Sequence, residues 1–260
     1  TLSGDGTVAY DGAGDQGIVE DIYYNLTAGS GGIKTLGGAV TVTNDLTIDT
    51  DVTIAMDTHD LSVTNATDID GTLAVAGNAL TLNGESDIDG TITISTGTVD
   101  ADSSFDGTNG TITFTGAGNL TLSSTVTSLG TLSTTNGTVT YDGVDQTIFS
   151  DDYYSLTAGG GSGTKTLGGA VTVANDLTID TDVTIAMDTH LLTVTNITDI
   201  DGTLAVAGDT LTLDGSSDID GTITISTGTV DANGVFDATS GFVTFTDAGN
   251  LNLFSTVTDL

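Results

Sequence analysis

The chain has 260 residues, and 36 Asp and Glu against only two Lys and Arg give it a formal net charge of −34 at pH 7. Nucleic-acid binding depends on basic side chains, so this composition excludes it, and the same deficit argues against adsorption to anionic membranes. Hydrophobic residues make up 37% of the chain, which is too many for an acidic disordered segment, and we expect the chain to fold. Cys is absent, and no apolar run approaches the ~18 residues of a membrane span.

Short runs in which apolar and polar residues alternate recur along the chain. In chain order they include Leu80-Thr81-Leu82, Ile92-Thr93-Ile94, Ile112-Thr113-Phe114, Leu120-Thr121-Leu122 and Val139-Thr140-Tyr141. Alternation with a period of two, in short runs bounded by Gly, Asn and Asp, is the pattern of β-strands. No stretch has the 3.6-residue period of a helix, so we expect an all-β protein.

The strands repeat at a short, nearly constant spacing. The segment Asp-Ile-Asp-Gly-Thr-Ile-Thr-Ile at 87–94 follows a closely similar segment at 68–75 after 19 residues. Such a period is typical of a solenoid, in which each unit buries its apolar face against the next. At this spacing the apolar residues form inward columns: Ile54, Leu73, Ile92, Ile112 and Leu132; Met56, Val75, Ile94 and Phe114; Leu61, Leu80, Val99, Leu120 and Val139; and Ile69 and Ile88.

The sequence therefore predicts a parallel β-helix, or β-solenoid, with about three short strands in each coil of 19–20 residues. Stacked coils lie ~4.8 Å apart, so ~13 coils would make a rod ~60 Å long. Between residues 150 and 182 the spacing is irregular, and there the pattern predicts strands but no assignment to coils.

A longer repeat is superimposed on the short one. The opening Thr-Leu-Ser returns at 131–133. From Lys34 onward, each residue of the first copy corresponds to the residue 131 positions later, so that Lys34 corresponds to Lys165. Roughly 80% of positions 34–129 are identical in 165–260, the mark of a tandem repeat. We predict two near-identical units of a continuous solenoid, 1–130 and 131–260. Neither end reads as a polar cap, so we expect the chain to continue or copies to associate end to end.

A resemblance rests on three segments of the second unit. Tyr-Tyr-Ser-Leu-Thr-Ala-Gly at 153–159, the run from Gly163 to Val173 and Asp-Leu-Thr-Ile at 176–179 resemble the repeats of very large bacterial surface proteins. The 19-residue coil is also similar to that of filamentous-haemagglutinin-type adhesins. The resemblance implies a fibrous β-helical scaffold outside the cell or on its surface. The net charge of −34 separately fits a saline or calcium-containing exterior, because salt or bound cations screen the self-repulsion. It implies no particular ligand, because such families share a scaffold and differ in what they touch.

Aspartates recur at the same 19-residue spacing and form a ladder. Eight of them are candidate metal ligands: Asp68, Asp70, Asp87, Asp89, Asp199, Asp201, Asp218 and Asp220. Each pair flanks an inward Ile, so both carboxylates point to solvent, and coils ~4.8 Å apart are near the span that one Ca²⁺ ion bridges. The alternative is that Asp simply favours turns. No motif requires a cofactor, because the calcium-binding nonapeptide Gly-Gly-x-Gly-x-Asp is missing.

These features favour a structural role over catalysis. No nucleophile or base with an orienting partner is visible, and no Arg is present to hold an anionic substrate, so we expect no enzyme. The first hypothesis is a rigid acidic shaft or spacer, stiffened by calcium if the ladder binds it. The second is a repetitive binding module for calcium, surface glycans or ice. Rows of outward Thr, such as Thr91 and Thr93, resemble an ice-binding face, although β-propensity explains them as well.

Overall fold

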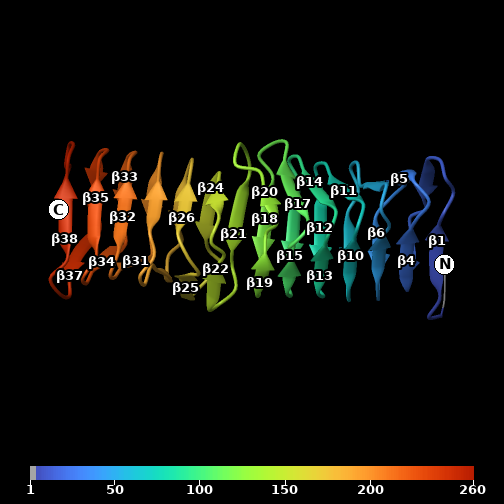
Figure 1. Ribbon diagram of the computed structural model, residues 1–260, viewed down its shortest axis with the longest axis horizontal. Coiled ribbons are helices and arrows are strands. Elements are labelled where there is room, and N and C mark those ends of the chain that lie inside the picture. The colour runs from blue at the N-terminus through green and yellow to red at the C-terminus, as the bar shows by residue number, and fades with distance from the viewer. Residues whose placement is uncertain (1–3) are drawn as a thin grey trace. The chain divides into compact units, whose positions relative to one another are not determined.

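The computed structural model describes residues 4–260, and the chain falls into two compact units, Thr1–Gly137 and Thr138–Leu260. Every regular element within the described residues is a β-strand, and the 38 strands make about 13 turns. Within each unit, a strand pairs in parallel with the strand three places further along the chain, as β11 does with β14 and β31 with β34. Consecutive strands therefore enter three different sheets in rotation, which confirms the predicted β-solenoid with three short strands per coil (Figure 1).

The first unit contains three parallel sheets. The first sheet consists of β1 (Thr7–Tyr10), β4 (Asn25–Ala28), β7 (Leu46–Ile48), β10 (Thr67–Ile69), β13 (Ser86–Ile88), β16 (Phe105–Asp106) and β19 (Val126–Ser128). The second consists of β2 (Gln16–Ile18), β5 (Gly32–Leu36), β8 (Val52–Ala55), β11 (Thr72–Val75), β14 (Thr91–Ile94), β17 (Thr111–Phe114) and β20 (Thr131–Leu132). The third is part of a 12-stranded sheet, and its strands in this unit are β3 (Ile22–Tyr23), β6 (Val40–Val42), β9 (Leu61–Val63), β12 (Ala79–Leu82), β15 (Thr98–Ala101) and β18 (Asn119–Leu122).

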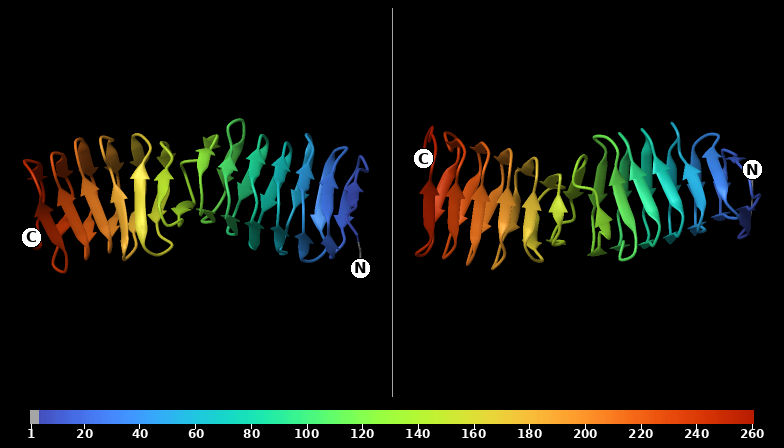
Figure 2. Two further views of the ribbon diagram at one scale, coloured as in Figure 1. Left: turned by 90° about the horizontal axis from the view of Figure 1, so that it is seen from below. Right: turned by 45° about the horizontal axis from the view of Figure 1, so that its top comes forward.

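The second unit is built in the same way. One set of paired strands is β21 (Thr138–Tyr141), β24 (Ser155–Ala158), β27 (Leu177–Ile179), β30 (Thr198–Ile200), β33 (Ser217–Ile219) and β36 (Phe236–Asp237). Another is β22 (Gln146–Ile148), β25 (Gly163–Leu167), β28 (Val183–Ala186), β31 (Thr203–Val206), β34 (Thr222–Ile225) and β37 (Phe242–Phe245). The last is β23 (Asp152–Tyr153), β26 (Val171–Val173), β29 (Leu192–Val194), β32 (Thr210–Leu213), β35 (Thr229–Ala232) and β38 (Asn250–Leu253). The turned views of Figure 2 show these strands stacked along each unit on more than one side.

The core of each unit is a set of stacked aliphatic columns. In the first unit Leu73 lies in register with Ile54 on one side and with Ile92 on the other, and all three are fully buried. Leu80 is likewise in register with Leu61 and Val99. Burying such side chains is worth about 1.5–3 kcal/mol each, and no single turn achieves it alone. The predicted columns are confirmed in these registers.

Tight turns between strands need residues that tolerate unusual backbone. Asp51 and Asp182, at equivalent positions of the two repeats, have φ angles of 67° and 66°, in the left-handed region where Asp is better tolerated than most residues. Gly90 is required for a different reason, because a Cβ at this position would overlap the carbonyl group of Gly71 in the preceding turn. Some aspartates of the repeat therefore serve the turns.

The segment from 150 to 182, which the sequence leaves without a coil assignment, is also regular in the structure. β24 pairs with β21 and β27, so Leu156 lies in register with Val139 and Leu177. The two spacings are 17 and 21 residues, because the turns on either side differ in length. Unequal turn lengths obscure the period without changing the strand pairing.

Candidate functional site

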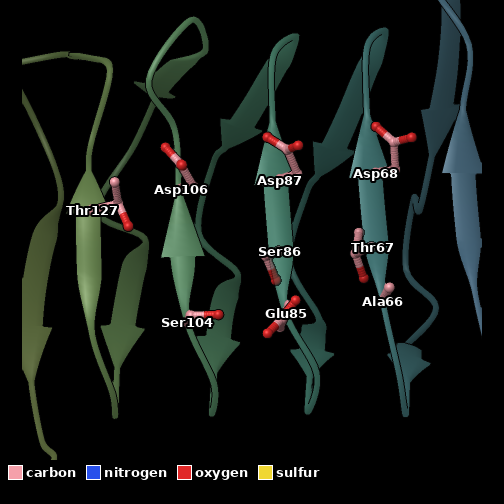
Figure 3. A pocket seen from close by; sticks show the side chains of 9 residues that line it. All are labelled: Ala66, Thr67, Asp68, Glu85, Ser86, Asp87, Ser104, Asp106 and Thr127. Atoms are coloured by element: carbon pink, nitrogen blue, oxygen red, sulfur yellow. The ribbon is translucent and has the colours of Figure 1, made fainter.

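The first unit carries an acidic groove of about 420 Å³ along strands β10, β13, β16 and β19. Its lining residues, shown in Figure 3, are Ala66, Thr67, Asp68, Glu85, Ser86, Asp87, Ser104, Asp106 and Thr127. The carboxylates of Asp68, Asp87 and Asp106 lie at one level near the ends of successive strands, and Glu85 and Ser104 lie near the strand starts (Figure 3). The groove therefore has a row of three carboxylates on one side and a fourth carboxylate on the other.

Strand alternation and register together create the row of carboxylates. In β10 the side chains of Thr67 and Ile69 are buried and that of Asp68 is exposed between them. Asp68 is in register with Asp87, and Asp87 with Asp106. A 19-residue coil thus places one carboxylate directly beside the next. Like charges stacked in this way destabilise a sheet.

The pKa values of the stacked aspartates are raised, because desolvation and neighbouring negative charges disfavour the ionised carboxylate. Partial loss of solvent raises the pKa of Asp68 above its ordinary value, and the charges of Asp70 and Asp87 raise it further. Desolvation and the charges of Asp89 and Asp106 raise the pKa of Asp87. In the second unit desolvation and neighbouring carboxylates also raise the pKa values of Asp199 and Asp218. Protonation is therefore favoured at these four aspartates, and burial likewise raises the pKa of Asp151.

The other members of the predicted pairs lie just beyond the strand ends. Asp70, Asp89, Asp201 and Asp220 are exposed. The N–H of Asp70 donates to the Ile48 carbonyl (2.9 Å), and Asp89 Oδ1 accepts a hydrogen bond from Asn109 Nδ2 (3.0 Å). Within residues 4–260, no three His, Cys, Asp or Glu side chains form a group that could hold a metal ion. Calcium binding by the eight aspartates therefore stays a prediction, and any ion would bridge pairs of carboxylates on adjacent turns.

Equivalent positions in the two repeats keep the aspartates but change the groove around them. Asp199, Asp218 and Asp237 replace Asp68, Asp87 and Asp106, with the same registers between strands. The opposite row of the groove changes from Ala66, Glu85 and Ser104 to Ile197, Ser216 and Val235. Ile197 is 46% exposed and Val235 40% exposed. The ladder is thus common to both units, and the fourth carboxylate is specific to the first.

Two buried lysines, Lys34 and Lys165, are the main feature that was not predicted from the sequence. Lys34 is fully buried, and its ammonium donates to the carbonyls of Gly12 (2.6 Å), Gly31 (2.8 Å) and Gly14 (3.0 Å). Gly12 and Gly14 belong to the preceding coil of the solenoid and Gly31 to the same coil as Lys34, so the ammonium joins two consecutive coils. Buried ammonium groups are tolerated only where such partners satisfy them.

Lys165 is the equivalent residue in the second unit. It is also fully buried and donates to the carbonyls of Gly143 and Val144, the latter at 3.3 Å. Burial lowers the pKa of Lys165, and the negative charges of Asp142 and Asp145 oppose that shift. The chain has only two Lys and Arg, so its surface presents no Lys or Arg side chain at all.

A sequence signal for the buried lysines does exist. Lys34 and Leu36 are two residues apart in one strand, and so are Lys165 and Leu167, so each lysine shares the inward face with a core leucine.

A pair of tyrosines also occurs at equivalent positions of the two units. Tyr10 and Tyr23 hydroxyls lie 2.9 Å apart, as do those of Tyr141 and Tyr153. Burial raises the pKa of Tyr153.

No family model, curated protein or solved structure matches the chain. No helix among the described residues is long and apolar enough to cross a membrane.

Proposed function

We propose that the chain is a structural repeat segment of a secreted bacterial cell-surface fibre or adhesin, in which it acts as a rigid acidic shaft or spacer. The observation that carries the proposal is the unbroken register of buried columns within each unit, such as Ile54, Leu73, Ile92 and Ile112. Within each unit, successive turns are hydrogen-bonded to one another along three sheets, so bending a unit would break contacts on one side. A stack of this kind lengthens by adding turns and needs no other scaffold.

The surface charge supports a location outside the cell. Both lysines are buried, so the surface carries 36 carboxylates without a compensating Lys or Arg. Such a surface repels nucleic acids and anionic membranes and keeps neighbouring fibres apart. External salt screens the repulsion along the shaft, because the Debye length is ~10 Å at 0.1 M and shortens as salt rises.

The spacer hypothesis predicts how extension scales with repeat number. Covalent arrays of one, two and four copies of the chain would be placed between a surface anchor and a fluorescent tag. The height of the tag should rise in proportion to copy number. Each copy holds two repeat units, and each unit should add roughly 30 Å at ~4.8 Å per turn. A Gly/Ser linker with equal residue number is the control, since its extension grows only as the square root of length. Square-root growth of the solenoid arrays would contradict the proposal.

A second candidate function is cation binding by the aspartate ladder. The observation that favours it is the strand register that places Asp68 beside Asp87 and Asp87 beside Asp106, and likewise Asp199, Asp218 and Asp237 in the second unit. Ca²⁺ suits such a surface because it accepts six to eight oxygen ligands in flexible geometry. Glycans and ice stay the other predicted ligands of a repetitive face. Calcium and spacer functions are compatible, because bridging ions would stiffen the shaft.

A further inference from the structure

Four asparagines of the chain are followed directly by glycine, and hydrogen bonds hold their turns to different degrees. They are Asn83, Asn109, Asn136 and Asn233, and all four are exposed. An Asn-Gly pair is chemically labile, because glycine has no Cβ to keep its own backbone nitrogen away from the asparagine side chain. The attack of that nitrogen on the side chain needs a glycine N–H and an amide that are both free to move. The hydrogen bonds at each turn therefore decide which asparagine reacts.

Hydrogen bonds restrain the side-chain amides of three of the four pairs. In each, the amide nitrogen donates to an acceptor in the preceding coil, so the side chain reaches the glycine nitrogen only after a local opening of the turn. After Asn109 the N–H of Gly110 is held as well, by the Gly107 carbonyl (2.9 Å). The three amide bonds are those of Asn83 Nδ2 to the Val63 carbonyl (3.1 Å), Asn109 Nδ2 to Asp89 Oδ1 (3.0 Å) and Asn233 Nδ2 to Asp214 Oδ1 (2.7 Å).

The turn at Asn136 has neither restraint. Its amide nitrogen donates only to the hydroxyl of the adjacent Thr135, at 3.4 Å. Among residues 4–260, no group accepts a hydrogen bond from the N–H of Gly137. Of the four pairs, this is the one in which the amide and the glycine nitrogen are both free of bonds to another coil.

We propose that Asn136 is a site of spontaneous deamidation. The backbone nitrogen of Gly137 attacks Cγ of Asn136, and a new C–N bond closes a five-membered succinimide ring. The proton of the Gly137 N–H passes through solvent to the departing NH₂ group, which leaves as ammonia. Water then opens the ring at either carbonyl, so the product is an aspartate or an isoaspartate, with one more negative charge than before. The inference is independent of the spacer function.

The first copy of the repeat shows that this turn accepts a carboxylate. Asp5 and Gly6 stand at the positions of Asn136 and Gly137, and Asp5 is exposed. Conversion of Asn136 to aspartate is therefore compatible with the turn. Isoaspartate differs, because its main chain runs through the former side chain and is one methylene longer.

The same turn covers a core aromatic ring of the first unit. The N–H of Phe114 donates to Ser133 Oγ (2.8 Å), and Gly137 lies so close to the Phe114 ring that a Cβ would overlap it. Phe114 is consequently 3% exposed. A methylene inserted next to Gly137 displaces it from the ring, because the contact is already close-packed. Isoaspartate at 136 should therefore uncover Phe114 and loosen the last coil of the first unit.

The test is mass spectrometry of peptides from the full chain after incubation in mildly alkaline buffer, once folded and once in concentrated urea. In the folded chain Asn136 should be converted at least about tenfold faster than Asn109 and Asn233, because those two react only from locally opened states. In urea all four asparagines should react at similar rates, since each precedes a glycine. If Asn136 of the folded chain reacts no faster than Asn109 and Asn233, the proposal is overturned.

Asn136→Gln is the matched control for the effect on Phe114, because the longer side chain cannot form the five-membered ring. After incubation, chymotrypsin should cleave after Phe114 at least about tenfold faster in wild type than in this variant. Freshly prepared Asn136→Asp adds the charge on a normal main chain and should resist chymotrypsin as fresh wild type does. Equal cleavage of incubated wild type and Asn136→Gln would overturn the proposed opening of the turn.

Discussion

The two repeats have the same interior and differ on the surface that flanks their aspartate ladders. In the first repeat Glu85 lies across the groove from Asp68 and Asp87, and in the second Ser216 takes its place between the exposed Ile197 and Val235. The registers of the ladder strands are the same in both. A solenoid constrains its inward residues by stacking and leaves the outward ones free to vary.

The largest expected difference between the repeats concerns the buried lysines. Lys34→Met would remove the buried ammonium that bonds three glycine carbonyls and joins two coils, and we expect a loss of about 3 kcal/mol or more in the free energy of unfolding. Lys165→Met should cost less, because its ammonium has two carbonyl partners. The measurement is urea-induced unfolding followed by circular dichroism.

Thr35→Met is the matched control for Lys34→Met, because Thr35 follows Lys34 in β5 and its side chain is only half-buried. It should change the unfolding free energy by no more than about 0.5 kcal/mol. Equal stability of the wild type and both lysine variants would show that the ammonium groups do not hold the turns together.

Calcium gives the next largest effect and tests the ladder directly. Ca²⁺ that binds only the folded stack should raise its stability by ~2.7 kcal/mol at a hundredfold excess over the dissociation constant. Mg²⁺ should do less, because it demands tighter octahedral geometry. Thermal unfolding in chelator, Ca²⁺, Mg²⁺ and NaCl of matched ionic strength separates binding from screening. If NaCl stabilises the chain as well as Ca²⁺ does, the ladder is only a charged surface.

Exchanging Glu85 and Ser216 between the two repeats tests whether the fourth carboxylate of the first groove contributes to calcium binding. Glu85→Ser makes the first groove resemble the second, and Ser216→Glu does the reverse. If Glu85 contributes to cation binding, the first variant should lower the calcium-dependent rise in melting temperature and the second should increase it. Equal responses would restrict any binding to the aspartates that both repeats share.

The smallest expected effect is a gain in stability on mild acidification. The raised pKa values of Asp68, Asp87, Asp199 and Asp218 mean that the folded chain holds these protons more tightly than the unfolded chain does. Their contribution therefore grows as the pH falls from 7 through the folded pKa values towards the ordinary Asp value of ~3.9, and it is lost as the pH rises again.

Two aspartates act in the opposite direction. Hydrogen bonds from Ala79 and Asn78 lower the pKa of Asp60, and those from Thr239 lower the pKa of Asp237, so acid removes their contributions. Urea unfolding at about pH 5 and pH 7 should still show the greater stability at the lower pH. The double variant Asp68→Asn, Asp87→Asn should reduce this dependence, and an unchanged dependence would place its origin elsewhere.

Much of the fold could be predicted from the sequence, because local pattern determines it. Alternation within runs such as Ile92-Thr93-Ile94 places side chains on two faces, and a constant 19-residue spacing brings like residues into register in successive turns. The rows of Asp68, Asp87 and Asp106 follow from the same two rules. A repeated sequence is thus enough to determine the columns and the ladder.

Tertiary structure decided what depends on residues from different turns. Lys34 looks like a surface residue by type, and only the carbonyls of Gly12 and Gly14, supplied by the preceding turn, make its burial favourable. The strand pairing around Leu156 was hidden because turns of unequal length lie on either side of it. The groove opposite the aspartates combines Ala66, Glu85 and Ser104 from three turns. Spacing along the chain specifies which residues stack, whereas the partners of a buried charge are specified only when the turns lie against each other.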